Sequence, residues 1–186
     1  MAVRKTPAYA CLAALSLTVL AAQNGRPRRE PDIDYVASTE LAVAAMLKLA
    51  DVKKTDVVYD LGCGDGRIVI AAAKNYGARG VGIDIDPVRI AEAKANAKKA
   101  GVENLVRFDE DDLFNADIHD ATVVTLYLGP KVNMKLRPKL LKELKPGTRI
   151  VSHSFDMGDW KPEKEVNVDG ERIYFWTVPT KTAAAN

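Results

Sequence analysis

The chain has 186 residues, of which 47% are hydrophobic and 28% are charged, and its formal net charge is +2 at pH 7. This length fits one domain with a sizeable core, and the composition is that of an ordinary soluble globule. So small a charge gives no reason to expect nucleic acid as a partner. Cys11 and Cys63 have no Cys or His neighbour at metal-ligand spacing, so neither a disulfide framework nor a metal site is expected.

The first 25 residues differ from the rest. An uncharged stretch from Thr6 to Gly25 follows Arg4 and Lys5. About 20 apolar residues can span a bilayer, and a small-residue site near residues 19–21 also fits a cleaved secretory signal. Residues 1–25 are therefore predicted to be either a signal peptide or an N-terminal membrane anchor. Three arginines within residues 26–29 favour an anchor whose C-terminal side stays in the cytoplasm.

The remaining chain divides simply. Residues 26–34 form a polar linker, residues 35–180 form one domain, and residues 181–186 are predicted to be a disordered tail. The domain begins with a helix capped by Ser38 or Thr39. We expect this domain to be a monomer.

The most informative stretch is Val57 to Ile70. A short apolar run rich in β-branched residues predicts a buried strand, which ends at Asp60 and Leu61. Glycines then stand at the alternate positions 62, 64 and 66, with Cys63 between the first two, and an apolar helix follows. Glycines allow a sharp turn and a close approach of ligand to backbone, and the helix directs its free amides to the same place. A nucleotide-like ligand is therefore expected here.

The spacing distinguishes between possible ligands. Dinucleotide loops usually have the pattern Gly-x-Gly-x-x-Gly, whereas this loop is Gly-x-Gly-x-Gly with the acid Asp60 before it. A carboxylate there would repel a pyrophosphate but suits the ammonium and sulfonium groups of S-adenosylmethionine. The stretch resembles motif I of the class I S-adenosylmethionine-dependent methyltransferases.

A second predicted strand, residues 80–85, ends in acids. Asp84 lies at the distance from the glycines where a nucleotide fold places the carboxylate that binds the ribose hydroxyls. Asp86 stands directly before Pro87 and is the better helix cap, which leaves Asp84 for the ribose. Ile85 is then expected to pack on the adenine face.

A third predicted strand, residues 105–108, is followed by four consecutive acids and the pair Leu113-Phe114. The methyltransferase resemblance implies that the acid before such a pair accepts a hydrogen bond from the adenine amino group. By position this is Asp112, with Asp111 as the alternative and Leu113 beside it. A carboxylate is well suited to accept from an exocyclic amine.

The later segments complete the predicted sheet. Residues 121–128 predict a buried strand ending in Tyr127-Leu128-Gly129-Pro130, which lacks the Asn/Asp-Pro-Pro-aromatic motif for planar amine acceptors. A helix over residues 131–145 should be kinked or split at Pro138. A strand at 149–152 and a hairpin around Asp169-Gly170 follow. The expected fold is α/β and Rossmann-like: a doubly wound, mostly parallel seven-stranded sheet with a terminal antiparallel hairpin.

A closer resemblance emerges when motifs are taken together. Five motifs occur in a fixed order along the chain. They are Tyr35-Val36-Ala37-Ser38, the glycine loop, Leu126 to Pro130, Arg149 to Ser152 with Phe155 and Trp160-Lys161-Pro162, and Val178-Pro179. This pattern resembles the small membrane-anchored protein-lysine methyltransferases that modify the adenine nucleotide translocase and the ATP synthase c-subunit. The resemblance implies that the segment containing Tyr35 lies over the cofactor, so Tyr35 is expected to contact its methionine part.

The expected activity is methyl transfer from S-adenosylmethionine to a lysine side chain of a protein. Membrane-associated proteins are among the expected substrates. Four side chains are expected around the acceptor amine: Tyr127, His153, Phe155 and Trp160. The catalytic candidates among them are Tyr127, His153 and Trp160. A small-molecule or thiol acceptor is the alternative within the enzyme reading, and a non-catalytic binding domain is the alternative outside it. Because the cofactor is made in the cytosol, we expect a cytoplasmic domain on an anchor, with export after signal cleavage as the alternative.

Overall fold

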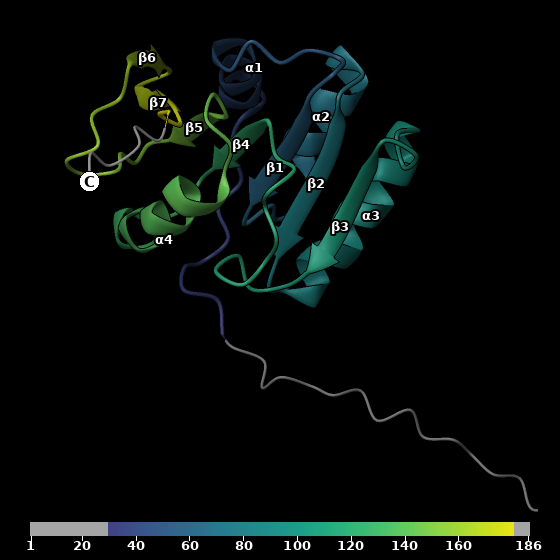
Figure 1. Ribbon diagram of the computed structural model, residues 1–186. Helices are drawn as coiled ribbons and strands as arrows, with labels where there is room; N and C mark the ends of the chain where they lie inside the picture. Colours follow the sequence, from purple (N-terminus) through teal and green to yellow (C-terminus); the bar gives the residue numbers. More distant parts are fainter. Residues whose placement is uncertain (1–29, 181–186) are drawn as a thin grey trace, which may run out of the picture.

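The computed structural model describes residues 30–180, and its centre is one sheet of seven strands in the order β3-β2-β1-β4-β5-β7-β6 (Figure 1). The expectations for residues 1–29 and 181–186, a signal or anchor, the start of the linker and a disordered tail, lie outside the described residues. The strands are β1 Val57–Leu61, β2 Arg79–Asp84, β3 Val106–Glu110, β4 Val123–Leu126, β5 Arg149–His153, β6 Lys164–Val168 and β7 Glu171–Thr177.

Five neighbouring strands, β3 to β5 in the sheet order, are parallel, and β7 pairs antiparallel with both β5 and β6. The predicted α/β sheet with its terminal hairpin is therefore confirmed. Asp169 and Gly170, which connect β6 to β7, have φ values of 52° and 86°. Positive φ at both central residues is the requirement of a tight two-residue hairpin turn, which explains why this dipeptide was a reliable signal.

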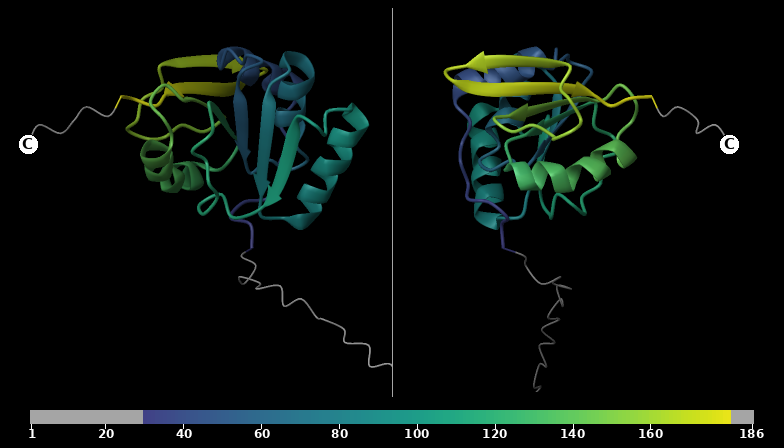
Figure 2. Two further views of the ribbon diagram at one scale, coloured as in Figure 1. Left: turned by 45° about the vertical axis from the view of Figure 1, so that its right-hand side comes forward. Right: turned by 90° about the vertical axis from the view of Figure 1, so that its left-hand side faces the viewer.

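The helices cover the two faces of the sheet unequally. The helices are α1 Glu40–Leu49, α2 Arg67–Tyr76, α3 Pro87–Ala100 and α4 Pro130–Glu143. The first three pack on one face, where a buried cluster joins Val43 and Leu47 to Val69 and Ala93. On the other face α4 packs beside β4 and β5, and the loop after β3 covers β1 and β2 with Ile118 (Figure 2). Both sheet faces are thus closed, which long apolar parallel strands require.

The structure decides between the alternatives of one local prediction and contradicts part of another. Thr39, rather than Ser38, caps α1, because its side chain accepts a hydrogen bond from the amide of Ala42 at 3.1 Å. The helix containing Pro138 is not split, since α4 runs without interruption over 14 residues. Proline removes one amide hydrogen bond, and packing of Leu136 and Leu140, both fully buried, holds the helix together across that gap.

Within residues 30–180, none of the helices combines the length and the apolar character needed to cross a bilayer. The apolar stretch between Thr6 and Gly25 is not part of that range.

Candidate active site

The site lies at the carboxyl ends of the parallel strands, where the chain order in the sheet reverses between β1 and β4. Loops on either side of such a switch point diverge and leave a crevice for a ligand. Two hollows open there and share Tyr35, Val36, Gly62 and Tyr127. The larger has a volume of about 420 Å³. The crevice therefore brings segments from residue 30 to residue 132 to one place.

The glycine loop between β1 and α2 has the backbone shape that its sequence predicts. Gly62, Gly64 and Gly66 have φ values of 80°, 52° and 78°, in the left-handed region that favours glycine. Gly62 and Cys63 line the hollows, whereas Gly64 and Gly66 are not among the described lining residues. A side-chain carbon on Gly66 would lie 2.6 Å from the ring of Phe108, so Gly66 serves the packing of helix against sheet.

Asp60 lies under the glycine loop with only 2% of its surface exposed, and it lines the smaller hollow. Burial raises the pKa of the Asp60 carboxyl to about 7, and a hydrogen bond from the hydroxyl of Thr125 at 2.8 Å opposes that rise. The carboxylates of Asp84 and Asp65 add to the increase. A cation placed in the smaller hollow would relieve this accumulation of negative charge.

Asp84 ends β2 and holds the glycine loop in place. Its two carboxylate oxygens accept hydrogen bonds from the amides of Gly64 at 2.8 Å and Asp86 at 2.9 Å. The carboxylate of Asp86 caps α3 by accepting from the amide of Val88 at 2.8 Å. Asp84 and Ile85 both line the larger hollow. The inferred role of Asp86 as the cap of α3 is confirmed, and contact of Asp84 with the ribose stays a prediction.

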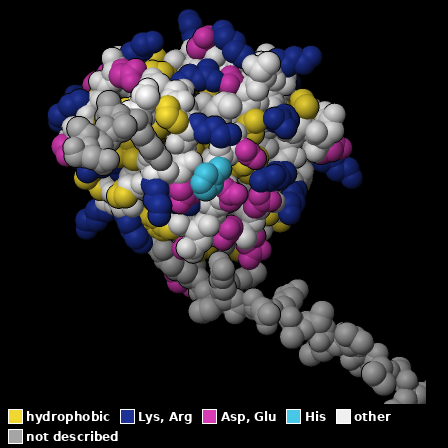
Figure 3. Space-filling view, in the orientation of Figure 1, with side chains coloured by type: hydrophobic (Ala, Val, Ile, Leu, Met, Phe, Trp, Pro, Cys, Tyr) yellow, Lys and Arg dark blue, Asp and Glu magenta, His cyan; other side chains and the backbone are white. Residues whose placement is uncertain are grey.

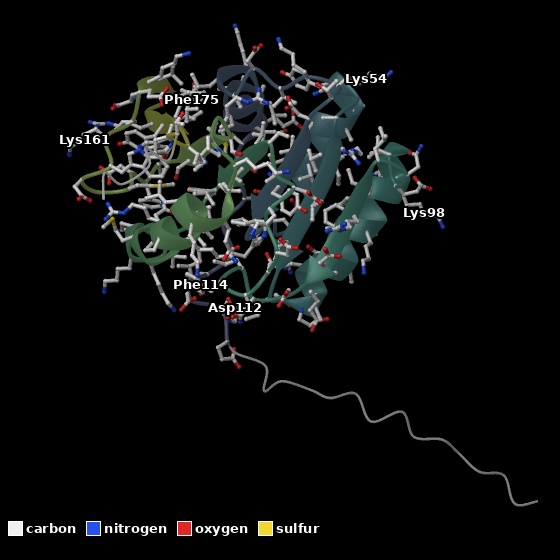
Figure 4. The ribbon with its side chains drawn as sticks, viewed as in Figure 1. Lys54, Lys98, Asp112, Phe114, Lys161 and Phe175 are labelled. Atoms are coloured by element: carbon white, nitrogen blue, oxygen red, sulfur yellow. The ribbon has the colours of Figure 1, made fainter. Side chains whose placement is uncertain are left out.

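The loop after β3 contributes the next acids. Asp111, Asp112 and Leu113 line the larger hollow, and Figure 4 shows Asp112 beside Phe114 at the lower edge of the molecule. Asp112 accepts a hydrogen bond from the amide of Phe114 at 3.0 Å, and Asp111 accepts one from the amide of Asp112 at 2.8 Å. Both candidates for the adenine contact therefore lie in the crevice, and the geometry does not choose between them.

Residues 30–38, here called the strap, cross the opening before α1 begins. Residues 30–36 line the larger hollow. The ring of Tyr35 lies so close to the glycine loop that a side-chain carbon on Gly64 would be 2.2 Å from it. The guanidinium carbon of Arg89 lies 4.8 Å from the centre of that ring. The structure thus places Tyr35 over the glycine loop, and its contact with the methionine part of the cofactor stays a prediction.

Three of the predicted acceptor-side residues meet at the ends of β4 and β5. The rings of Tyr127 and His153 have centroids 4.1 Å apart, and Tyr127 and Phe155 are stacked at 6.3 Å. His153 is 3% exposed, and its Nε2 has no hydrogen-bond partner among the described residues. Burial lowers the pKa of His153, and the carboxylate of Glu171 opposes that shift. His153 is therefore neutral at pH 7.

Trp160 is not brought to this group. Its ring packs on Trp176 with centroids 6.0 Å apart, and its carbonyl accepts a hydrogen bond from Nε1 of Trp176 at 2.8 Å. It belongs to the apolar cluster beneath α4 and lines neither hollow. This corrects the assignment of Trp160 as a catalytic candidate. The chain turns back after Phe155, and the short bridge between Met157 and Trp160 carries the indole to the core.

Some residues of the site were not identified from the sequence. Arg67 follows the glycine loop and donates from Nη1 to the carbonyl of Ser38 at 2.7 Å. Arg89 lines the larger hollow, and Thr125 supports Asp60. Arginine on a helix and threonine in a strand are ordinary surface and strand residues, so only their tertiary neighbours distinguish them.

Replacing Gly64 with alanine should test how closely the strap and the loop fit. The new methyl group would meet the Tyr35 ring at 2.2 Å, and φ at this position is 52°. We expect Tyr35 to be displaced and affinity for S-adenosylhomocysteine to fall about tenfold or more, with a loss of stability of about 1 kcal/mol from the left-handed conformation. Calorimetric titration and thermal unfolding measure the two effects. Gly147→Ala, with a φ of 87° and nothing within 4 Å, is the matched control for the backbone term.

The strand order, the glycine loop and the acids at the ends of β1, β2 and β3 together define an S-adenosylmethionine-dependent methyltransferase of the Rossmann-like class. Residues 60–164 match the family described as the ANTKMT methyltransferase domain. The chain belongs to this family.

Individual relatives agree with this class. A protein-lysine N-methyltransferase of Saccharolobus islandicus is 48% identical over 140 residues, covering 75% of this chain and 87% of the relative. The adenine nucleotide translocase lysine N-methyltransferase of Mus musculus is 32% identical, covering 81% and 67%. A crystal structure described as an RNA methyltransferase from Salinibacter ruber, in complex with S-adenosyl-L-homocysteine, is 57% identical with a TM-score of 0.78, covering 81% and 98%.

Proposed function

We propose that this methyltransferase transfers its methyl group to the ε-amine of a protein lysine. The charge of the crevice carries this proposal. The described residues that line the larger hollow include seven carboxylates and one guanidinium, that of Arg89; the carboxylates belong to Glu30, Asp32, Asp34, Asp84, Asp86, Asp111 and Asp112. Figure 3 shows carboxylates gathered on the lower part of one face, with lysines and arginines around them.

This charge discriminates between classes of acceptor. A lysine ammonium, or a basic segment that contains one, is attracted to a group of carboxylates, whereas the phosphates of RNA are repelled. The relative from Salinibacter ruber is described as an RNA methyltransferase, so RNA is the second candidate acceptor. The segment that follows β4, Tyr127-Leu128-Gly129-Pro130, lacks the motif that many enzymes use for planar amines, which also supports lysine.

The chemistry asks little of the protein beyond alignment. The amine displaces the thioether of the cofactor in line, and the thioether leaves without a proton. The enzyme must hold the amine at the methyl group and exclude water. The amine must also arrive without its proton, which burial beside the rings of Tyr127 and Phe155 promotes, because burial disfavours the charged form. The carboxylates at the opening attract the lysine ammonium, and the rings of Tyr127 and Phe155 favour the neutral amine.

The test combines labelled S-adenosylmethionine with the purified enzyme and three substrates from a strain lacking its gene: membranes, cytosolic protein and total RNA. We expect label on lysine residues, located by mass spectrometry of peptides. Label in RNA alone or in small molecules alone would overturn the lysine proposal but keep the methyltransferase. If cofactor binds and no label appears anywhere, the domain is non-catalytic. The Asp84→Ala enzyme serves as the background control.

Charge at the opening gives a second prediction. Changing Glu30, Asp32 and Asp34, all exposed on the strap, to their amides should raise KM for the lysine substrate several-fold at low salt. Affinity for S-adenosylhomocysteine should change less than twofold. Glu103→Gln, an exposed carboxylate outside the lining, is the matched control. A KM that stays constant in the triple variant and does not depend on salt would remove the electrostatic argument.

We infer that residues 1–25 tether the domain to a membrane on its cytoplasmic side, within reach of membrane-associated proteins. The uncharged stretch of this segment and the arginines after it support the tether, and the cytosolic supply of cofactor supports the orientation. Fractionation with protease protection tests this proposal. A processed protein released on the far side of the membrane would contradict it.

A further inference from the structure

Ser38 is the point at which the strap is tied to the body of the enzyme. Its hydroxyl oxygen lies 3.0 Å from Nδ1 of His153, and its carbonyl accepts the hydrogen bond from Arg67 at 2.7 Å. Only 4% of Ser38 is exposed. No backbone–backbone hydrogen bond joins residues 30–38 to any other part of the described chain. The two interactions of Ser38 therefore attach the strap at its end nearest α1, next to the hydrogen bond between Tyr35 and Asp65.

The two partners of Ser38 are themselves held firmly. Arg67 begins α2 and is gripped by Asp65, with 2.6 Å between Nη2 and Oδ2 and 2.9 Å between Nε and Oδ1. His153 ends β5 and packs against Tyr127, which lines both hollows, with the two rings tilted by 35°. Ser38 thus bridges the glycine-loop side of the crevice and the acceptor side.

The strap in front of Ser38 is thinly packed. Tyr35 is 45% exposed and Val36 is 62% exposed, although both line the hollows. Tyr35 rests on the glycine loop and beneath Arg89. Few buried contacts and few backbone hydrogen bonds mark a segment that opens at low cost in free energy. When Ser38 is released, one wall of the cofactor cavity is released with it.

We propose that Ser38 is a positioning residue that latches the strap over the bound cofactor, with His153 and Arg67 as the two fixed ends of the latch. Opening of this latch limits the release of S-adenosylhomocysteine. Because His153 also packs against Tyr127, closure of the strap and ordering of the aromatic residues expected around the acceptor are one event. This inference concerns cofactor binding and does not depend on lysine being the acceptor.

The dissociation rate of S-adenosylhomocysteine tests the latch directly. Ser38→Ala should raise that rate about tenfold, the effect expected for one lost buried hydrogen bond, and leave the association rate within about twofold. Thr39→Ala is the matched control, because it removes the cap of α1 from the adjacent residue and leaves the latch intact. Thr39→Ala should lower the melting temperature and keep the dissociation rate near that of the wild type. Equal dissociation rates in Ser38→Ala and the wild type would overturn the proposal.

Variants of His153 separate the latch from general loss of packing. His153→Asn places an amide near the position of Nδ1 and should keep slow dissociation, whereas His153→Leu should match Ser38→Ala. Combining Ser38→Ala with His153→Leu should give no further acceleration, since both remove the same bond. Additive effects would contradict the latch. Hydrogen exchange of the wild type needs no variant: the amides of residues 35–38 should exchange more slowly with S-adenosylhomocysteine bound, and unchanged exchange would also overturn the proposal.

Discussion

Replacing Asp84 with alanine is expected to weaken binding of S-adenosylhomocysteine by roughly ten- to 150-fold. Hydrogen bonds to a charged group contribute about 1.5–3 kcal/mol, and the carboxylate of Asp84 lines the larger hollow at the end of β2. Calorimetric titration measures the change. Asp86→Ala, which removes the cap of α3 two residues later, should cost helix stability of about 1 kcal/mol and much less affinity.

Asp84 also supports the glycine loop through the amide of Gly64 at 2.8 Å, so its loss could act indirectly. A 2′-deoxy analogue of S-adenosylhomocysteine resolves the two effects. If Asp84 binds the ribose hydroxyls, the wild type should bind the analogue more weakly, and the Asp84→Ala enzyme should bind both ligands alike. An analogue penalty that persists in the variant would show that Asp84 acts on the loop alone.

The second large effect concerns pH and Asp60. Its carboxyl has a pKa of about 7 in the ligand-free protein because it is buried. A cationic ligand in the smaller hollow favours the ionised form and lowers that pKa. Affinity for S-adenosylmethionine should therefore rise on the order of tenfold between pH 5.5 and 7.5, and binding below pH 7 should release a proton. Titrations in buffers of different ionisation enthalpy measure both quantities.

The free energy of unfolding of the ligand-free protein should fall as pH rises, whereas affinity for S-adenosylmethionine rises. Between about pH 4 and pH 7 the folded protein keeps a proton on Asp60 that the unfolded chain, with a pKa near 3.9, has lost. The contribution of Asp60 to the free energy of unfolding thus falls as pH rises through this window and is constant above it. Asp60→Asn should flatten both profiles. A variant that retains the wild-type slopes would show that another group titrates.

Much of the fold followed from local patterns in the chain. The glycines at 62, 64 and 66 and the turn Asp169-Gly170 require backbone conformations that few other residues adopt. Asp86 caps the start of α3 as expected, and Gly101 caps its end. Pro138 does not split α4, because a single missing amide is a local cost, whereas the buried face of the helix extends over three turns.

The acids of the site could also be anticipated. Parallel strands end at the same edge of a sheet, so acids at the ends of consecutive strands must converge there. Asp60 and Asp84 were proposed from their positions around the glycine loop, and Asp112 was implied by the methyltransferase resemblance; all three line the hollows of the crevice. The choice of Asp112 over Asp111 stays a prediction, because both residues line the larger hollow.

The sequence by itself determined the sheet, the glycine loop and the acids at the strand ends, since each depends on neighbours along the chain or on the common direction of parallel strands. Only the tertiary structure decided that Trp160 packs on Trp176, and that Ser38 meets His153 across 115 positions of sequence. Those contacts depend on where the irregular segments after β5 and before α1 turn. No periodicity encodes such turns, because they arise from packing against elements distant in the chain.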